Sequence, residues 1–296
     1  MSRWLVTGSA GKLGHDLVTV LAATPGAEVV AAPRRVLDVT DAEAVSEAVD
    51  GCDVVVNCAA WTDVDGAEAD EAGAFKVNAA GPANMAAACA KAAAVLVQIS
   101  TDYVFAGNAS EPYRAEAPVE PVNAYGRSKA AGEAAVCQIL PDRGYIVRTA
   151  WLYGERGPSF VASILRAAAE RQILDVVSDV TGQPTWSYPL AEQIVALGSA
   201  ALAGGAEPGI YHGTASGSTT WYGLACTVFE QSGLDPNRIR AVTSENFARP
   251  ARRPAFSVLD HSSWARAGLT PMADWRGMLT EALGRPFFAE LRGDLA

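Results

Sequence analysis

The chain lacks both an excess of positive charge and any long apolar run. Its 296 residues carry 33 acidic and 23 basic side chains, a formal net charge of -10. Nucleic acids and anionic membranes select clustered Lys and Arg, so this balance argues against either as a partner. No segment is apolar for long enough to span a bilayer. The apolar run after Arg3 stops at Gly8, too short for a secretion signal, and we therefore expect a cytoplasmic protein.

Histidine and cysteine are scarce and scattered. The three histidines show no metal-ligand spacing, and the five cysteines are an odd number without paired spacing. We expect reduced cysteines that pack mostly in the core. Structural or surface roles are expected for His15, His212 and His261, and no catalytic metal is expected.

Strand-like and helix-like patterns alternate in the first half of the chain. Half of all residues are hydrophobic, enough to bury a large core as one large domain or two smaller ones. Strands are predicted at 4–6, 28–32, 54–58, 95–99 and 145–148. Helices are predicted at 41–49 and 71–93, and around Leu13 and Tyr125. Such alternation is typical of α/β proteins with a doubly wound, Rossmann-type parallel sheet.

The composition changes beyond about residue 150. Helices are predicted at 159–171 and 190–202, and the stretches between and after them are rich in Gly, Pro, Thr, Trp and Arg. We expect residues 1–150 to form a dinucleotide-binding Rossmann domain. Residues 151–296 are expected to form mainly a smaller substrate-binding lobe, with some segments crossing back to the first domain.

A glycine-rich stretch from Gly8 to Gly14 lies between the first predicted strand and a helix whose apolar face includes Leu13, Leu17 and Leu21. In this setting the glycines allow a tight turn and a close approach of the backbone to a pyrophosphate at the helix N-terminus. An ordinary strand-to-helix turn would show the same pattern. We interpret the stretch as a cofactor cradle.

Tyr125 and Lys129 stand four residues apart. On a helix this spacing puts both side chains on one face, where the ammonium can stabilise a phenolate and lower the tyrosine pKa. A tyrosine of this kind can donate a proton near neutral pH, although such pairs are also common on solvated helix faces. Thr101 follows the buried strand predicted at 95–99, so we expect its hydroxyl at the carboxyl end of the sheet, where ligands bind.

These motifs resemble, in order, those of the dTDP-4-dehydrorhamnose reductases, a family of the extended short-chain dehydrogenase/reductases. The matching segments cover nearly the whole chain: 8–14, 37–41, 57–65, 100–105, 125–129, 148–154, 182–185, 219–221 and 249–254. So many matches in the same order make a chance resemblance a poor explanation.

The resemblance implies NAD(P)H-dependent reduction at C4 of a dTDP-6-deoxy-4-ketohexose. Tyr125 would protonate the developing alkoxide, Thr101 would bind the carbonyl oxygen, and Lys129 would lower the tyrosine pKa and hold the nicotinamide ribose. The expected reaction converts dTDP-4-dehydro-6-deoxy-L-mannose, or dTDP-6-deoxy-L-lyxo-4-hexulose, to dTDP-L-rhamnose.

The resemblance also implies contacts with both ligands. Besides Tyr125 and Lys129, the expected cofactor-binding residues are Gly8, Ala10, Gly11, Lys12, Leu13, Gly14, Arg34, Arg35, Asp38, Val39, Ala59, Ala60, Trp61 and Ser100. The expected substrate-binding residues are Thr62, Val64, Asp102, Tyr103, Trp151, Trp221, Arg252 and Arg253. For Trp221, packing within the lobe is an equally good interpretation.

The second predicted strand runs into Pro33, Arg34 and Arg35. A fold specific for NAD usually places a carboxylate there for the ribose hydroxyls, whereas arginines suit the 2′-phosphate of NADP. We therefore expect NADPH as the cofactor, with NADH possible. Two solvated loop arginines are the alternative interpretation.

Two departures from the family pattern bear on assembly and one on the sugar pocket. Some members dimerise through a Mg²⁺ held by glutamates, and here Asp16 and Tyr188 occupy two such positions. Loss of a carboxylate weakens a site built from oxygen ligands, so we expect no structural Mg²⁺ and a monomer, with a dimer possible. Val180 replaces a glutamine that many members carry.

Three alternatives remain at this point. A dehydratase or epimerase is disfavoured because Tyr103 stands where sugar-nucleotide dehydratases carry a glutamate. A 4-ketoreductase for another dTDP-deoxysugar, used for a natural-product glycoside, has the same motifs because pocket shape decides sugar stereochemistry. A non-enzymatic dinucleotide-binding regulatory subunit is opposed by the retention of Thr101, Tyr125 and Lys129.

Overall fold

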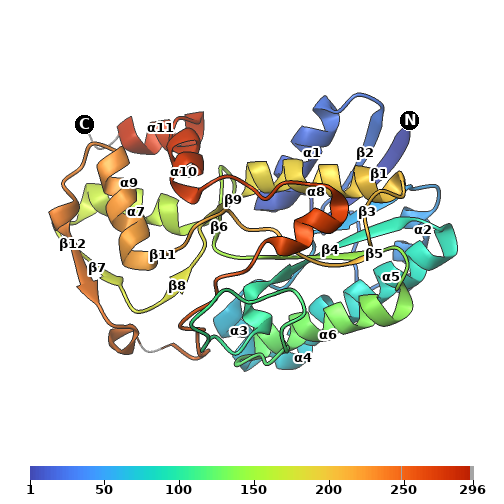
Figure 1. The fold of residues 1–296 in the computed structure, drawn as a ribbon, viewed down its shortest axis with the longest axis horizontal. Coiled ribbons are helices and arrows are strands. Elements are labelled where there is room, and N and C mark those ends of the chain that lie inside the picture. The colour runs from blue at the N-terminus through green and yellow to red at the C-terminus, as the bar shows by residue number, and fades with distance from the viewer. Residues whose placement is uncertain (248, 294–296) are drawn as a thin grey trace.

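Six parallel strands form the central sheet of the computed structural model, which describes residues 1–247 and 249–293 (Figure 1). Their order across the sheet is β10-β5-β4-β3-β1-β2. Their bounds are Ser2–Thr7 (β1), Ala27–Ala32 (β2), Val54–Asn57 (β3), Val95–Thr101 (β4), Gly144–Thr149 (β5) and Gly209–His212 (β10). The strand order reverses between β1 and β3, the point at which open sheets bind ligands. The predicted Rossmann-type sheet is confirmed.

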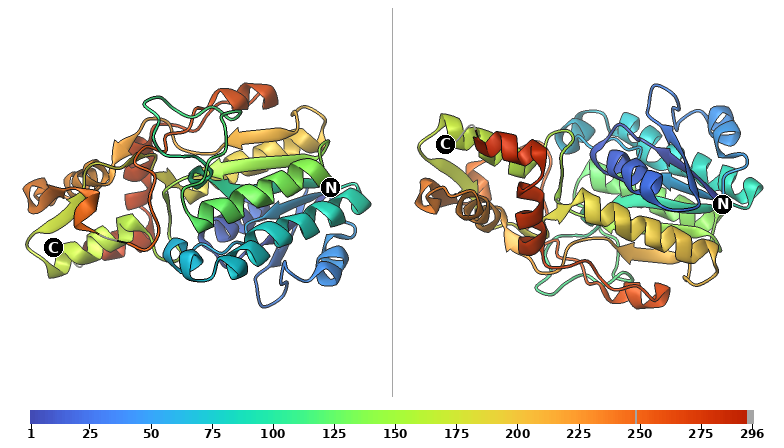
Figure 2. Two further views of the ribbon diagram at one scale, coloured as in Figure 1. Left: turned by 90° about the horizontal axis from the view of Figure 1, so that it is seen from below. Right: turned by 90° about the horizontal axis from the view of Figure 1, so that it is seen from above.

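Helices cover both faces of this sheet (Figure 2). One face packs against α1 (Lys12–Ala23) and α8 (Ser187–Leu202), and the other against α2 (Ala42–Val49), α5 (Gly81–Ala92) and α6 (Ala124–Ile139). Side chains alternate between the two faces along β1, so each face has its own hydrophobic core. Trp4 and Val6 pack in the core beneath α1 and α8, and Leu5 packs in the core on the opposite face.

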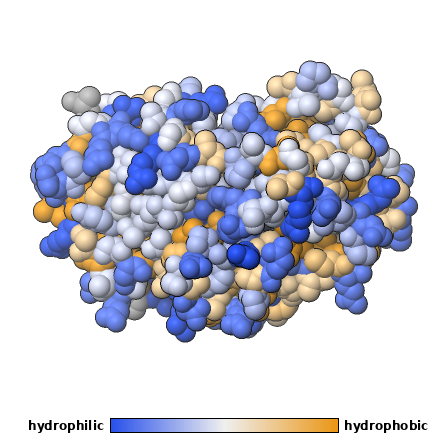
Figure 3. Space-filling view, viewed as in Figure 1, coloured by the Kyte–Doolittle hydropathy of each residue, from blue (hydrophilic) through white to orange (hydrophobic). Residues whose placement is uncertain are grey.

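The C-terminal half forms a lobe beside the sheet and also contributes β10 and α8 to the sheet and its cover. The remaining elements are α7 (Phe160–Glu170), α9 (Trp221–Gln231), α10 (Trp275–Leu283), α11 (Pro286–Gly293) and the pairs β6 (Leu152–Tyr153) with β9 (Thr185–Trp186), β7 (Leu174–Val177) with β12 (Ile239–Val242), and β8 (Thr181–Gly182) with β11 (Thr219–Thr220). Among the described residues, no helix combines the length and apolarity needed to cross a bilayer. On the face seen in Figure 3, apolar patches are interleaved with polar side chains.

The single helix predicted over 71–93 is interrupted. The chain forms α3 (Val64–Ala69) and α4 (Glu71–Phe75), then a π-helical turn at Lys76–Ala80, before α5 begins. Pro82 causes the interruption because it has no N–H to donate to the carbonyl of Asn78, four residues earlier. That carbonyl instead packs against Gly132 of α6.

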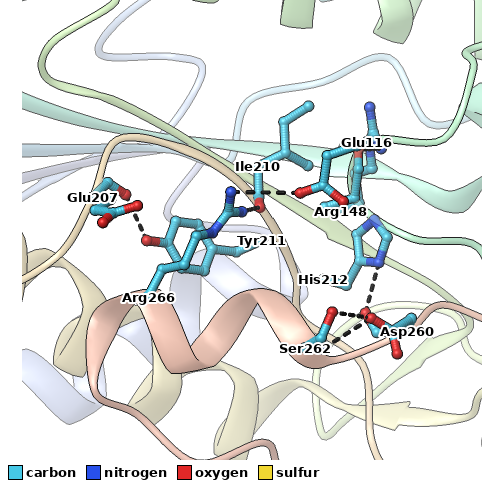
Figure 4. Close-up of polar contacts among 10 residues, drawn as sticks. Glu116, Arg148, Glu207, Ile210, Tyr211, His212, Asp260, Ser262 and Arg266 are labelled. Atoms are coloured by element: carbon cyan, nitrogen blue, oxygen red, sulfur yellow. Dashed lines mark hydrogen bonds and ion pairs between the residues drawn. The ribbon is translucent and has the colours of Figure 1, made fainter.

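The edge strand β10 is covered by the short 3₁₀ helix Ser262–Ala267 (Figure 4). The guanidinium of Arg266 donates to the carbonyl of Ile210 at 2.6 Å, and the indole of Trp264 donates to the carbonyl of His212 at 2.9 Å. These bonds occupy edge carbonyls that could otherwise pair with another strand. His212 is itself buried, and burial lowers its pKa to about 3, so its ring is neutral.

The five cysteines are free thiols. Cys52 and Cys89 are buried, Cys58 and Cys226 are half-buried, and Cys137 is exposed. The expectation of reduced cysteines agrees with this arrangement.

Two glycine substitutions should have opposite effects on stability. A Cβ atom at Gly132 would overlap the carbonyl oxygen of Asn78, so Gly132→Ala should destabilise the protein by about 1–3 kcal/mol. Gly277 in α10 has open space around the same position, so Gly277→Ala should stabilise it by about 0.5–1 kcal/mol. Urea unfolding of both variants measures the difference, and a stabilised Gly132→Ala would contradict the packing described here.

Candidate active site

A cleft of about 700 Å³ lies at the carboxyl ends of the strands and reaches the lobe. Most of the expected site residues line it: Gly8, Gly11, Lys12, Leu13, Gly14, Arg34, Asp38, Val39, Ala59, Ala60, Thr62, Val64, Ser100, Thr101, Asp102, Tyr103, Tyr125, Lys129, Trp151 and Trp221. The lining therefore runs without a break from the glycine-rich loop to the tryptophans of the lobe.

Five expected residues lie outside this lining: Ala10, Arg35, Trp61, Arg252 and Arg253. Ala10 and Arg35 are exposed, and the indole N–H of Trp61 donates to the carbonyl of Asp63. The guanidinium of Arg253 instead pairs with the carboxylate of Asp65 at 3.0 Å. It lies 6.0 Å from the ring of Tyr103, which does line the cleft.

The glycine-rich loop leaves space that only glycine can fill. Gly8 has a φ of +60°, and a Cβ atom there would lie 2.8 Å from the backbone nitrogen of Ala59. A Cβ atom at Gly14 would lie 2.5 Å from the carbonyl oxygen of Gly8. Helix α1 has no side-chain cap at Gly11, so its first N–H groups are available to an anion in the cleft.

A chain of hydrogen bonds fixes the carboxyl ends of β1, β3 and β4. The hydroxyl of Thr7 donates to Asn57 Oδ1 at 2.5 Å, and Asn57 Nδ2 donates to Gln98 Oε1 at 2.7 Å. Gln98 Nε2 and Lys129 Nζ both donate to the carbonyl of Ile99, at 2.8 and 2.6 Å. Sequence reasoning missed this chain, although polar residues at the ends of three apolar strands are a usable signal.

Asn78, in the π-helical turn, holds the loop that carries Ala59 to Thr62. Its amide accepts from the backbone N–H of Trp61 at 2.8 Å and donates to the carbonyl of the same residue at 3.0 Å. It also donates to Ser128 Oγ on α6 at 3.0 Å. The interrupted helix thus positions one wall of the cleft against the helix that carries Tyr125 and Lys129.

Thr101 and Tyr125 face each other at the carboxyl end of β4. The hydroxyl of Thr101 donates to Asp102 Oδ1 at 2.9 Å, and the side chains of Thr101 and Tyr125 both line the cleft. The ring of Tyr103 meets that of Tyr125 edge-on, with centroids 5.7 Å apart. Two hydroxyl groups therefore converge on the same part of the cleft.

The expected lowering of the Tyr125 pKa was wrong in direction. Burial raises the pKa of Tyr125 because the phenolate would lose its hydration, and the nearby hydroxyl of Thr101 opposes this only in part. The ammonium of Lys129 binds the carbonyl of Ile99, and burial lowers the pKa of Lys129 to about 8. Tyr125 is therefore a protonated phenol at neutral pH, the form required of a proton donor.

Two buried hydroxyls in the cleft wall have no hydrogen-bond partner among the described residues. They are Ser100 Oγ and Thr149 Oγ1, on neighbouring strands. Buried polar atoms are normally satisfied, so these two point to a ligand. Thr149 was not among the expected residues, although it pairs in register with Thr101.

The lobe contributes a pair of stacked tryptophans. The rings of Trp151 and Trp221 lie 3.4 Å apart, with 8° between their planes. Trp151 has a φ of +46°, a conformation that costs free energy in a residue with a side chain. Trp221 also contacts Phe160 within the lobe, so its packing role and its place in the cleft wall coexist.

A loop that carries a cation lines the cleft next to the glycine-rich loop. Arg156 lines the cleft, and Lys12 Nζ donates to the carbonyl of Pro158 at 2.7 Å. Sequence reasoning missed Arg156, which stands two residues after the matching segment 148–154. Lys12, Arg34, Lys129 and Arg156 are the cations that line the cleft in the described part of the chain.

Asp16 and Tyr188 line a second cavity of about 390 Å³. Asp16 accepts a hydrogen bond from the hydroxyl of Ser187 at 2.5 Å, and the guanidinium of Arg285 lies 4.9 Å from the ring of Tyr188. Within the described residues, 1–247 and 249–293, no group of three or more His, Cys, Asp or Glu side chains could hold a metal ion. The expected monomer without Mg²⁺ stays a prediction.

The fold and this cleft define an extended short-chain dehydrogenase/reductase. A glycine-rich loop lies where the strand order reverses, and Thr101, Tyr125 and Lys129 line the same cleft as this loop. A family model described as the RmlD substrate binding domain matches residues 2–286, and the chain belongs to this family. It is an oxidoreductase, and the resemblance expected from the motifs is confirmed.

Similar proteins cover almost the full chain. A dTDP-4-dehydrorhamnose reductase from Streptomyces griseus is 54% identical over 282 residues, which cover 95% of this chain and 92% of that protein. A dTDP-4-keto-6-deoxy-D-glucose reductase from Streptomyces niveus is 48% identical, with 95% and 96% covered. The solved structure of dTDP-4-dehydrorhamnose reductase from Bacillus anthracis in complex with NADP is 34% identical, with a TM-score of 0.90 and 96% and 99% covered.

The stability of the protein should depend on the ionisation of Asp102. This side chain is 2% exposed, and burial raises its pKa to about 6 against hydrogen bonds from Ser257 and Thr101. An acid with a raised pKa binds its proton more tightly in the folded chain. Its stabilising contribution is complete below the unfolded pKa of about 3.9 and is lost as the pH rises through about 6.

The side chain of Asp102→Asn cannot ionise, so this variant should gain about 2 kcal/mol of stability relative to the unmodified protein as the pH rises from 4 to 7. Urea unfolding at both pH values measures this gain. The exposed Asp142→Asn is the control and should follow the unmodified protein. A pH-independent difference between Asp102→Asn and the unmodified protein would show that the buried carboxyl does not titrate as described.

Proposed function

We propose that the protein uses NADPH to reduce the C4 keto group of dTDP-4-dehydro-6-deoxy-L-mannose, giving dTDP-L-rhamnose. The observation that carries this proposal is the convergence of the Thr101 and Tyr125 hydroxyls in a cleft continuous with the glycine-rich loop. Two donors aimed at one position suit a carbonyl oxygen that gains negative charge during reduction.

The cofactor preference is supported by charge. Arg34 lines the cleft just after β2, where it can pair with a 2′-phosphate. The nearby carboxylate of Asp38 accepts from the backbone and hydroxyl of Thr40, at 3.0 and 2.8 Å, which leaves it less available to ribose hydroxyls. The relative from Bacillus anthracis was solved with NADP. We propose NADPH as the preferred cofactor, with NADH accepted.

The uncapped N-terminus of α1 and the side chain of Lys12 would hold the cofactor pyrophosphate. The reduced nicotinamide, when bound, supplies the hydride. Tyr125, kept protonated by burial, donates its proton to the oxygen at C4 as that oxygen becomes an alkoxide. Thr101 hydrogen-bonds the same oxygen, and the positive charge of Lys129 stabilises the phenolate that remains.

The sugar nucleotide would bind between the sheet and the lobe. Trp151 and Trp221 supply an apolar wall for the sugar, and Thr62, Val64 and Tyr103 line the opposite side. Arg253 would meet the diphosphate only by leaving Asp65, since it lies behind Tyr103 rather than in the lining.

A 4-ketoreductase for another dTDP-deoxysugar is the second candidate. The relative from Streptomyces niveus, 48% identical, is named for a different 4-ketosugar, dTDP-4-keto-6-deoxy-D-glucose. Both candidates use the same hydride and proton transfers and differ only in the shape of the sugar pocket.

Tyr125→Phe tests the proposed chemistry. Loss of the proton donor should lower kcat by about 10²- to 10⁴-fold, while the dissociation constant for NADPH stays within about twofold of its original value because the ring remains. Stopped-flow turnover and fluorescence titration measure the two quantities. Unchanged turnover would exclude Tyr125 as the acid, and no turnover even in the unmodified protein would favour a binding subunit.

A further inference from the structure

Three charged side chains are buried together beneath the cleft. Lys129, Glu133 and Arg148 are 4%, 5% and 1% exposed. Lys129 and Glu133 are four residues apart on α6, so they share one face of that helix. Arg148 meets Glu133 from β5. Buried charges are costly unless an opposite charge lies nearby, and Glu133 is the one anion among these three side chains.

Arg148 fixes the carboxylate of Glu133. Its Nε donates to one carboxylate oxygen at 2.9 Å and its Nη2 to the other at 2.6 Å. Arg148 is in turn held by the carbonyl of Ala115 at 3.1 Å and lies 4.8 Å from the ring of Phe105. His212, its register partner on β10, is neutral and lies on the same side of the sheet edge (Figure 4). The position of the Glu133 carboxylate is therefore fixed by its two hydrogen bonds with Arg148.

The third charged group is the ammonium of Lys129. It donates to the carbonyl of Ile99 at 2.6 Å, and burial lowers its pKa to about 8. The charge of Glu133 is the strongest influence that raises this pKa again. The other titratable group that acts on Lys129 is Cys58, directly after β3, and burial raises its thiol pKa to about 12. This thiol is neutral at neutral pH, so Glu133 is the anion that counters the burial of Lys129.

We propose that Glu133, clamped by Arg148, is a positioning residue that keeps Lys129 charged and directed at the cleft. The inference rests on the proposed function, in which Lys129 stabilises the phenolate of Tyr125. A purely structural role explains the pair less well, because a buried ion pair adds little net stability over apolar residues of similar size. The free-energy cost of burying the pair is explained if the negative charge of Glu133 is needed next to Lys129.

A double-mutant cycle with NADPH and the dTDP-4-ketosugar tests the inference. Assayed at pH 9, above the Lys129 pKa of about 8, Glu133→Gln should lower kcat by about tenfold, the loss of charged Lys129 expected when its pKa falls by about one unit, with KM little changed. In a Lys129→Met background the same substitution should change kcat by less than about twofold, since positioning acts only through Lys129. An equal loss in both backgrounds would overturn the inference.

A second variant covers the case in which Glu133→Gln fails to fold around an unpaired Arg148. Replacing both partners, as Glu133→Leu with Arg148→Met, removes both charges together. This variant should unfold at a urea concentration close to that of the unmodified protein and bind NADPH, yet retain the tenfold loss in kcat. Full kcat in this folded variant would overturn the inference.

Glu71→Gln is the matched control. Glu71 of α4 pairs with Arg127 of α6 at 2.7 Å in an exposed position, so the same chemical change removes a glutamate–arginine contact that does not involve Lys129. Its kcat should be unchanged, and a loss equal to that of Glu133→Gln would overturn the inference. Full activity of Lys129→Met would instead remove the proposed role of Lys129 itself, a result distinguishable from failure of the Glu133 assignment alone.

Discussion

The hydrogen bond from Lys129 Nζ to the carbonyl of Ile99, 2.6 Å long, joins helix α6 to the end of strand β4. Thr101 follows two residues after this carbonyl, and Tyr125 lies one turn before this lysine. The bond therefore sets the distance between the two hydroxyls that face the cleft. It is buried, so its charged donor needs the compensating network behind it.

That network extends in two directions from the same point. Toward the centre of the sheet, the carbonyl of Ile99 connects through Gln98 and Asn57 to Thr7, beside the glycine-rich loop. Toward the sheet edge, Glu133 and Arg148 connect the helix to β5 and to the covered strand β10. Polar contacts thus tie helix α6 both to the strands beside the glycine-rich loop and to the edge of the sheet.

The sequence was sufficient for the features that depend on neighbours along the chain. Apolar runs predicted the strands from β1 to β5, and glycines between a strand and a helix predicted the turn at Gly8. The residues of the cleft followed from motif resemblance. Contacts between distant segments could not be predicted: Asp65 holds Arg253 out of the lining, and the tie from Lys12 to Pro158 brings Arg156 to the cleft. The predicted direction of the Tyr125 pKa shift was wrong because the spacing of Tyr125 and Lys129 gives no measure of burial.

The most direct test of the account is NADPH oxidation with dTDP-6-deoxy-L-lyxo-4-hexulose, followed by identification of the product by NMR. The proposed function predicts efficient turnover to dTDP-L-rhamnose. Tight NADPH binding with negligible turnover of this sugar would contradict the proposed substrate and favour another dTDP-4-ketosugar.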